Sequence, residues 1–65
     1  MAMDHNDRLE DIRQRLVSIS EELEDLGLDV LRQAVDDGAS SRPPLERTIS
    51  TARRTVDKAS RTLEP

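Results

Sequence analysis

A seven-residue repeat near the C-terminus limits what this chain can fold into. Three triplets of arginine, threonine and an aliphatic residue begin seven residues apart: Arg47–Ile49, Arg54–Val56 and Arg61–Leu63. Ala52 and Ala59 repeat at the same interval. Because seven residues make nearly two turns of an α-helix, this period is typical of a helix that presents one face to another helix.

The N-terminal half keeps the same spacing with larger side chains. Its apolar residues recur in alternating steps of three and four from Leu9 to Val30. This spacing predicts an amphipathic helix over about residues 5–37. Gly38 suits the end of that helix, and Pro44 suits the first position of a second helix over about 44–63. The short linker 38–43 favours an antiparallel return of the chain.

We therefore predict an all-α fold in a single domain of residues 1–65, an antiparallel two-helix hairpin that resembles antiparallel coiled coils. That resemblance concerns architecture alone and implies no activity. The predicted helix–helix interface comprises Leu9, Ile12, Leu16, Ile19, Leu23, Leu26, Val30, Leu45, Ile49, Ala52, Val56, Ala59 and Leu63.

A second apolar edge argues for self-association. The chain has no Phe, Trp or Tyr, so its core must come from small aliphatic residues. If residues that stand opposite each other in the hairpin have numbers that add up to about 80, the second helix ends before it reaches the level of Leu9 and Ile12. One partner helix also cannot cover both the main stripe and a second edge. We expect dimerisation into a four-helix bundle, or docking on an unidentified protein partner. The second edge consists of Val17, Leu28, Leu31 and Val35.

Charge is divided unevenly within the net charge of −4. Residues 1–38 carry eleven acids and four arginines, which gives −7, and residues 39–65 carry six basic groups and three acids, which gives +3. An acidic helix beside a basic helix favours pairing within the hairpin or between subunits. The acidic cluster Glu21, Glu22, Glu24 and Asp25 is expected to face residues 54–58.

Arg47, Arg54 and Arg61 line one edge of the second helix and form a possible basic contact face. One alternative function is a nucleic-acid-associated regulator that touches phosphates through this face. The acidic total charge and the missing aromatic residues favour neutralisation and a solvated surface instead. A further alternative is an antitoxin-like inhibitory partner, suggested only by small size and acidic charge.

The sequence offers no catalytic, cofactor or metal site. It has no cysteine and no glycine-rich phosphate loop. Its sole histidine, His5, lies near the N-terminus, far in sequence from the acidic cluster. No apolar run is long enough for a membrane span, and Met1–Asp7 shows no signal-peptide pattern. We expect a non-enzymatic, cytoplasmic interaction or adaptor module, with neither nucleic acid nor membrane as its favoured partner.

Overall fold

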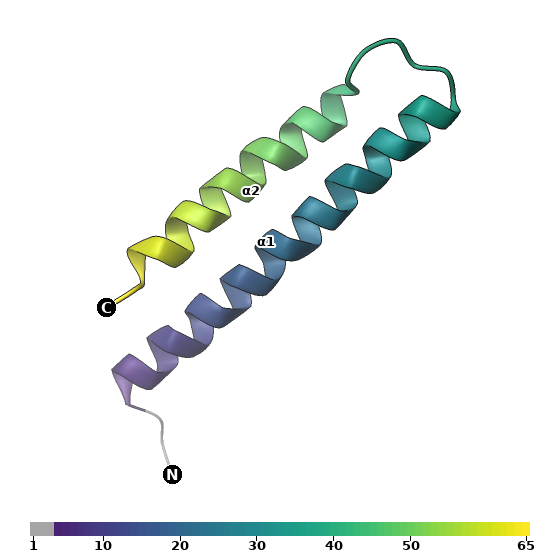
Figure 1. Cartoon of the computed structure of the whole chain (residues 1–65). Coiled ribbons are helices and arrows are strands. Elements are labelled where there is room, and N and C mark those ends of the chain that lie inside the picture. Colours follow the sequence, from purple (N-terminus) through teal and green to yellow (C-terminus); the bar gives the residue numbers. More distant parts are fainter. Residues whose placement is uncertain (1–3) are drawn as a thin grey trace.

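The protein is a pair of packed helices. The computed structural model describes residues 4–65, and the first three residues of the predicted 1–65 domain lie outside that range. Helix α1 runs from His5 to Asp36 and helix α2 from Pro44 to Thr62. The two helices lie side by side and antiparallel (Figure 1). Residues 4–65 contain no strand, so the predicted all-helical hairpin is confirmed.

Local chemistry explains where the helices begin and end. The Asp4 carboxylate accepts a hydrogen bond from the Asp7 backbone N–H at 2.7 Å, which caps the start of α1. Beyond Asp36 the chain turns at Gly38, whose φ of 81° is a conformation that glycine adopts without a steric cost. Pro44 then opens α2 at a position where a missing N–H costs nothing.

The register of the hairpin is set by two facing pairs. The Ser20 hydroxyl donates to the Asp57 carboxylate, and Gly27 lies against the Ile49 side chain. Facing residue numbers therefore add up to 76 or 77, not to the predicted 80. As a result α1 extends past the end of α2 by about two and a half turns, residues 5–13, instead of the four turns expected (Figure 1).

Small and polar residues occupy the middle of the seam, which is our name for the contact between α1 and α2. Ile49, at 7% exposure, is the one buried hydrophobic side chain among the described residues. Short side chains allow two helices to approach closely, but they bury little apolar area. The seam alone is therefore a small core. The other buried residues are Ser20 and Gly27 on α1 and Glu46 and Ser60 on α2.

Candidate interaction surfaces

The structure divides the predicted helix–helix interface into two sets. One set is buried or half-buried in the seam and consists of Leu16, Leu23, Val30, Ile49, Val56, Ala59 and Leu63. The other set is exposed and consists of Leu9, Ile12, Ile19, Leu26, Leu45 and Ala52. The seam thus uses only one side of each predicted stripe. Leu9 and Ile12 have a further reason for exposure, since they lie beyond the end of α2.

The exposed set, apart from Leu9, gathers on one side of the hairpin. At 100° per residue, Ile12, Ile19 and Leu26 lie about 80–120° around α1 from Ser20. Leu45 and Ala52 lie about 80–100° around α2 from Arg53, in the same rotational sense. In an antiparallel pair, equal rotations from the seam lead to the same side. We call the five exposed residues Ile12, Ile19, Leu26, Leu45 and Ala52 the apolar face. Leu9 lies only about 20° around α1 from Ser20, in line with the seam.

A polar network crosses the seam at its middle. One carboxylate oxygen of Asp57 accepts from the Ser20 hydroxyl, and the other pairs with Arg53 at 3.2 Å. The Ser60 hydroxyl donates to the backbone carbonyl of Asp57 at 2.8 Å. In the described residues every buried side-chain nitrogen or oxygen has a hydrogen-bond partner. The network fixes the register, because a shifted α2 would leave these buried groups unpaired.

Glu46 brings a second carboxylate into the seam near the turn. Its side chain is only 8% exposed, and it forms a salt bridge with Arg42 of the link. The Arg42 Nε atom donates to Glu46 Oε2 at 2.8 Å. Hydrogen bonding to Glu46 raises the pKa of the Arg42 guanidinium. This pair ties the link to the first turn of α2 and places an ion pair where an apolar contact was expected.

Near its N-terminus, α1 carries an ion pair on the segment that approaches the end of α2. Arg13 donates from Nε and Nη2 to the two carboxylate oxygens of Glu10, at 2.9 and 2.6 Å. Gln14 donates to the same carboxylate at 3.0 Å. The hydrogen bonds from Arg13 and then from Gln14 lower the pKa of Glu10 from 4.5 to about 2. Hydrogen bonding to Glu10 in turn raises the pKa of Arg13.

The expected pairing of the acidic cluster with the basic helix does not occur as ion pairs within the hairpin. Each salt bridge in residues 4–65 joins residues three or four apart in sequence. The acids Glu21, Glu22, Glu24 and Asp25 are all exposed. The carboxylate that does reach across is Asp57 of the basic half, since its position on α2 points it at Ser20. Residues 4–65 therefore contain no ion pair across the seam.

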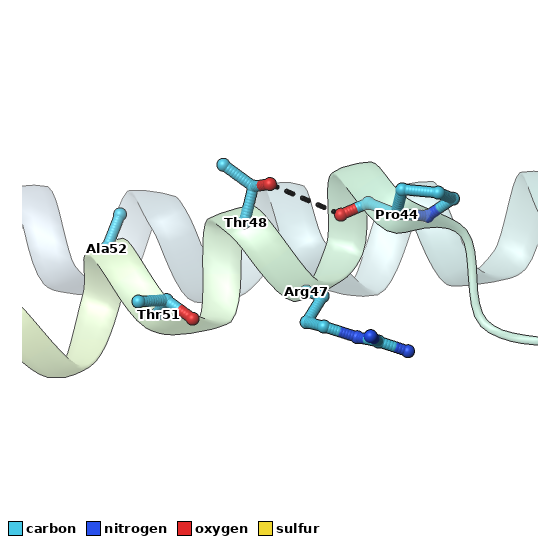
Figure 2. Close-up of a pocket in the computed structure, with 5 residues that line it drawn as sticks. All are labelled: Pro44, Arg47, Thr48, Thr51 and Ala52. Atoms are coloured by element: carbon cyan, nitrogen blue, oxygen red, sulfur yellow. Dashed lines mark hydrogen bonds between the residues drawn. The ribbon is translucent and has the colours of Figure 1, made fainter.

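The possible basic contact face lies on the other side of the hairpin from the apolar face. Arg47, Arg54 and Arg61 are all exposed. Figure 2 shows a surface depression beside Arg47 that is lined by Pro44, Arg47, Thr48, Thr51 and Ala52. Thr48 Oγ1 donates to the Pro44 carbonyl there, at 3.3 Å. Because every lining residue belongs to α2, this is an open groove on one helix and not an enclosed site.

The second apolar edge is only partly open. Val17 and Leu31 are half-buried beside the seam, whereas Leu28 and Val35 are exposed at 46% and 73%. Leu31, Val35 and Pro43 line a further hollow at the turn. This edge lies on the same side as the arginines, by the rotational argument given for the apolar face. The two sides of the hairpin thus differ: one is apolar, and the other mixes apolar groups with the arginines of α2 and the exposed acids Glu21 and Asp25 of α1.

No three His, Cys, Asp or Glu side chains of residues 4–65 come together in a way that could hold a metal ion. Neither α1 nor α2 has a stretch sufficiently long and apolar to cross a membrane.

Sequence reasoning missed the serines and the charged residues of the seam. Two series of residues spaced by seven lie in or beside the seam. The series on α1 is Arg13, Ser20, Gly27 and Ala34, and the series on α2 is Glu46, Arg53 and Ser60. The spacing was visible in the sequence as a signal. On α1 this series of residues stands one position after the apolar stripe. A prediction based on hydrophobicity alone therefore selects the stripe.

Comparison of the chain with protein-family models, with curated proteins and with solved structures found no match.

Proposed function

We propose that this chain is a non-enzymatic interaction module that self-associates, with two hairpins packing through their apolar faces into a dimeric four-helix bundle. The observation that carries this proposal is the apolar face itself. Ile12, Ile19 and Leu26 keep 38%, 43% and 50% exposure, and Leu45 keeps 58%. Large aliphatic side chains aligned on one side of a helix pair are typical of a surface that another protein covers.

The exposed area supports the same proposal. A compact monomer of 7.3 kDa exposes about 4,200 Å², whereas this chain exposes 5338 Å². The excess is about 1,140 Å² per chain, or about 2,300 Å² for two chains. Obligate homodimers bury about 2,000 Å² or more. The surplus area is therefore of the size that a dimer interface requires.

The small core gives an independent reason for assembly. Among residues 4–65 no large side chain is fully buried, and the seam is built around Ser20, Gly27 and Ser60. Small chains with little core gain stability by oligomerisation. In a bundle, the exposed leucines and isoleucines would join the half-buried Leu16, Leu23 and Val56 in one shared core.

The proposed bundle leaves a surface for an adaptor role. The side with Leu28, Val35 and the three arginines points away from the apolar face and stays outside the bundle. Because the α2 half of this surface is basic and its α1 half carries Glu21 and Asp25, an amphipathic segment with charges of both signs is the kind of partner that it suits. In this proposal the apolar face assembles the module, and the opposite side is available to a protein partner.

The first experiment is the absolute mass in solution by light scattering, over a range of protein concentrations. We expect about 15 kDa, twice the chain mass of 7.3 kDa. Concentration has to be followed by refractive index, since the chain lacks Trp and Tyr. A mass of 7.3 kDa at every concentration would contradict the proposal.

Two leucines provide a matched pair of variants. Leu26 and Leu28 are both on α1 and are exposed at 50% and 46%, but they lie on opposite sides of the hairpin. We expect Leu26→Asp to yield a monomer, because a charge in the proposed bundle core is not compensated. Leu28→Asp should remain a dimer. Equal masses for the two variants would show that the apolar face is not the interface.

A further inference from the structure

The exposed apolar residues of α1 are symmetric about one position. Ile12, Ile19 and Leu26 follow one another at intervals of seven residues, and each is exposed. If a second α1 is laid antiparallel on the first with Ile19 against Ile19, then Ile12 of each copy meets Leu26 of the other. Each of the three side chains thus meets one of the same three side chains of the second copy. Self-complementarity of this kind is what a twofold interface requires.

A line of charged residues beside this stripe has the same centre. Arg8, Arg15, Glu22 and Asp29 are seven residues apart, and all are exposed. They lie about 40° farther around α1 from the seam than the apolar stripe. The line carries two positive charges followed by two negative charges, and the sign changes between residues 15 and 22. We call these four residues the charged line.

Antiparallel pairing of α1 with itself makes the charged line self-complementary. With Ile19 at the centre, Arg15 approaches Glu22 of the second copy, and Arg8 approaches Asp29. Twofold symmetry repeats each contact, so four opposite-charge contacts form. Arg15 and Asp29 now make exposed pairs with Asp11 at 3.1 Å and Arg32 at 3.4 Å. Such exposed pairs are weak and leave the outer oxygens and nitrogens free for further contacts.

The other face-to-face arrangement would place α1 on α2 of the second copy, and the charges argue against it. At the equivalent place on α2, beside the exposed Leu45 and Ala52, stand Thr48, Thr55 and Thr62. These side chains are uncharged, and their hydroxyls already donate to backbone carbonyls of α2. In that arrangement the charged line would find no opposite charge.

The overhanging turns of α1 fit the α1-on-α1 arrangement as well. Leu9 lies beyond the end of α2 in its own hairpin (Figure 1). With Ile19 on the axis, Leu9 lies level with residues 47–48 of the second copy, within a turn of Leu45. The exposed leucine at each end of the hairpin thereby receives a neighbour.

The two copies of α2 also match about this axis. The hairpin register places the axis level with residues 57–58 of α2. Ala52 then faces Leu63 of the second copy, and Val56 faces Ala59. Each small residue thus stands opposite a larger one, which fills space evenly between the helices.

We propose that the second copy packs antiparallel on the apolar face about a twofold axis at Ile19, with α1 against α1, and that the charged line selects this orientation. The inference rests on the proposed self-association and adds the partner's orientation and its determinant.

Single cysteines test the orientation directly, because the wild-type chain has none. In a redox buffer we expect Ile19→Cys to form a disulfide-linked dimer. Leu26→Cys should not link to itself, since the two copies of residue 26 would lie about 21 Å apart along the bundle. A mixture of Leu26→Cys and Ile12→Cys should link. Efficient self-linking by Leu26→Cys would overturn the proposed axis.

Charge reversal tests the charged line without touching the apolar residues. We expect Arg8→Glu/Arg15→Glu to weaken the homodimer roughly tenfold to a hundredfold, because four attractive contacts become repulsive. Glu22→Arg/Asp29→Arg should do the same. Mixing the two variants should restore the wild-type affinity. Arg47→Glu/Arg54→Glu changes the net charge equally on the opposite side and serves as the control, with an unchanged dissociation constant.

The outcomes separate the two proposals. A wild-type chain that is monomeric by light scattering would end both the self-association and this arrangement. A dimeric wild type whose affinity is unchanged by either charge reversal would overturn the arrangement alone. Restoration of affinity in the mixture, with no effect of the control, would support both.

Discussion

Gly27 faces Ile49 without a side chain of its own. A Cβ atom at this position would lie 3.5 Å from Ile49 Cγ2, which is an ordinary van der Waals contact. The glycine is therefore not required by space for one methyl group, although it is costly inside a helix. At the residue scale, the seam tolerates an alanine here but has no room for a long side chain.

We expect Gly27→Ala to raise the free energy of unfolding by about 0.5–1 kcal/mol, because alanine is the better helix former. Gly27→Leu should lower it by about 1–3 kcal/mol, because the larger side chain separates the helices. Urea denaturation followed by circular dichroism at one fixed protein concentration measures both. A Gly27→Leu variant that is as stable as the wild type would contradict the close contact with Ile49.

Glu10 provides a pH-dependent test. Its pKa is lowered from 4.5 to about 2 by the hydrogen bonds from Arg13 and Gln14. A carboxylate whose pKa is lower in the folded state stabilises the fold above pH 4.5, and this contribution is lost as the pH falls from 4.5 toward 2. An NMR titration of the Glu10 carboxyl carbon should give a midpoint near 2.

In Arg13→Met, which keeps the aliphatic bulk but removes the charge, the Glu10 midpoint should return toward about 4.3, the value of a free glutamate. Arg15→Met removes a charge of the same sign from the same helix and is the control. Since Glu10 is exposed, added salt should also raise the wild-type midpoint. Equal midpoints in the wild type and Arg13→Met would show that Arg13 is not the cause.

At the element scale, the two helices differ in how they are held. Helix α1 is long and has a capping aspartate, whereas α2 contains Thr48, Thr55 and Thr62, whose hydroxyls donate to the carbonyl four residues earlier. Threonine loses side-chain freedom in a helix and is a weaker helix former than alanine. Contacts with α1 must therefore supply much of the stability of α2.

Replacement of the three threonines together by alanine should raise the free energy of unfolding by about 1 kcal/mol or more. Thermal unfolding followed by circular dichroism measures the change, and light scattering should show an unaltered mass. Thr51→Ala, on the same helix, is a single-site reference for the propensity effect alone. A loss of stability in the triple variant would mean that these hydroxyls make contacts that the hairpin does not contain.

The sequence predicted the two helices well and the seam only in part. Gly38 and Pro44 mark the turn unambiguously, because one favours positive φ and the other lacks an N–H. The choice between Ile19 and its neighbour Ser20 as the seam position was harder. Neighbouring residues on a helix point in directions about 100° apart. Hydrophobicity favours the aliphatic side chain as the seam residue, although the short side chain is the one that permits close packing. The buried Glu46 and the half-buried Asp57 could not be foreseen, since their partners are defined only by the folded register.

At the scale of the whole molecule, the hairpin is long and thin. Its Cα atoms span 54 × 20 × 12 Å. A body only 12 Å thick in one direction is a single layer of helices, so every side chain lies close to solvent. This shape explains why no large side chain in the described residues is fully buried. A second layer is the simplest way to create an interior.

If the dimer proposed above forms, the midpoint of thermal unfolding should rise with protein concentration, since dissociation and unfolding are coupled. A hundredfold range of concentration, followed by circular dichroism, is sufficient to see the shift. Leu26→Asp should abolish the concentration dependence and lower the midpoint, while Leu28→Asp should keep the dependence. A midpoint that is independent of concentration in the wild type would indicate that the isolated hairpin is the stable unit.

The short link between Asp36 and Pro44 has a consequence for the speed of folding. Closing so short a loop between two helices costs little entropy, and chains dominated by local contacts fold within microseconds to milliseconds. If the proposed dimer forms, the encounter of two chains is slower at micromolar concentrations. In stopped-flow refolding, the bimolecular step should therefore set the pace: helical signal returns in the dead time, and a later phase accelerates in proportion to chain concentration.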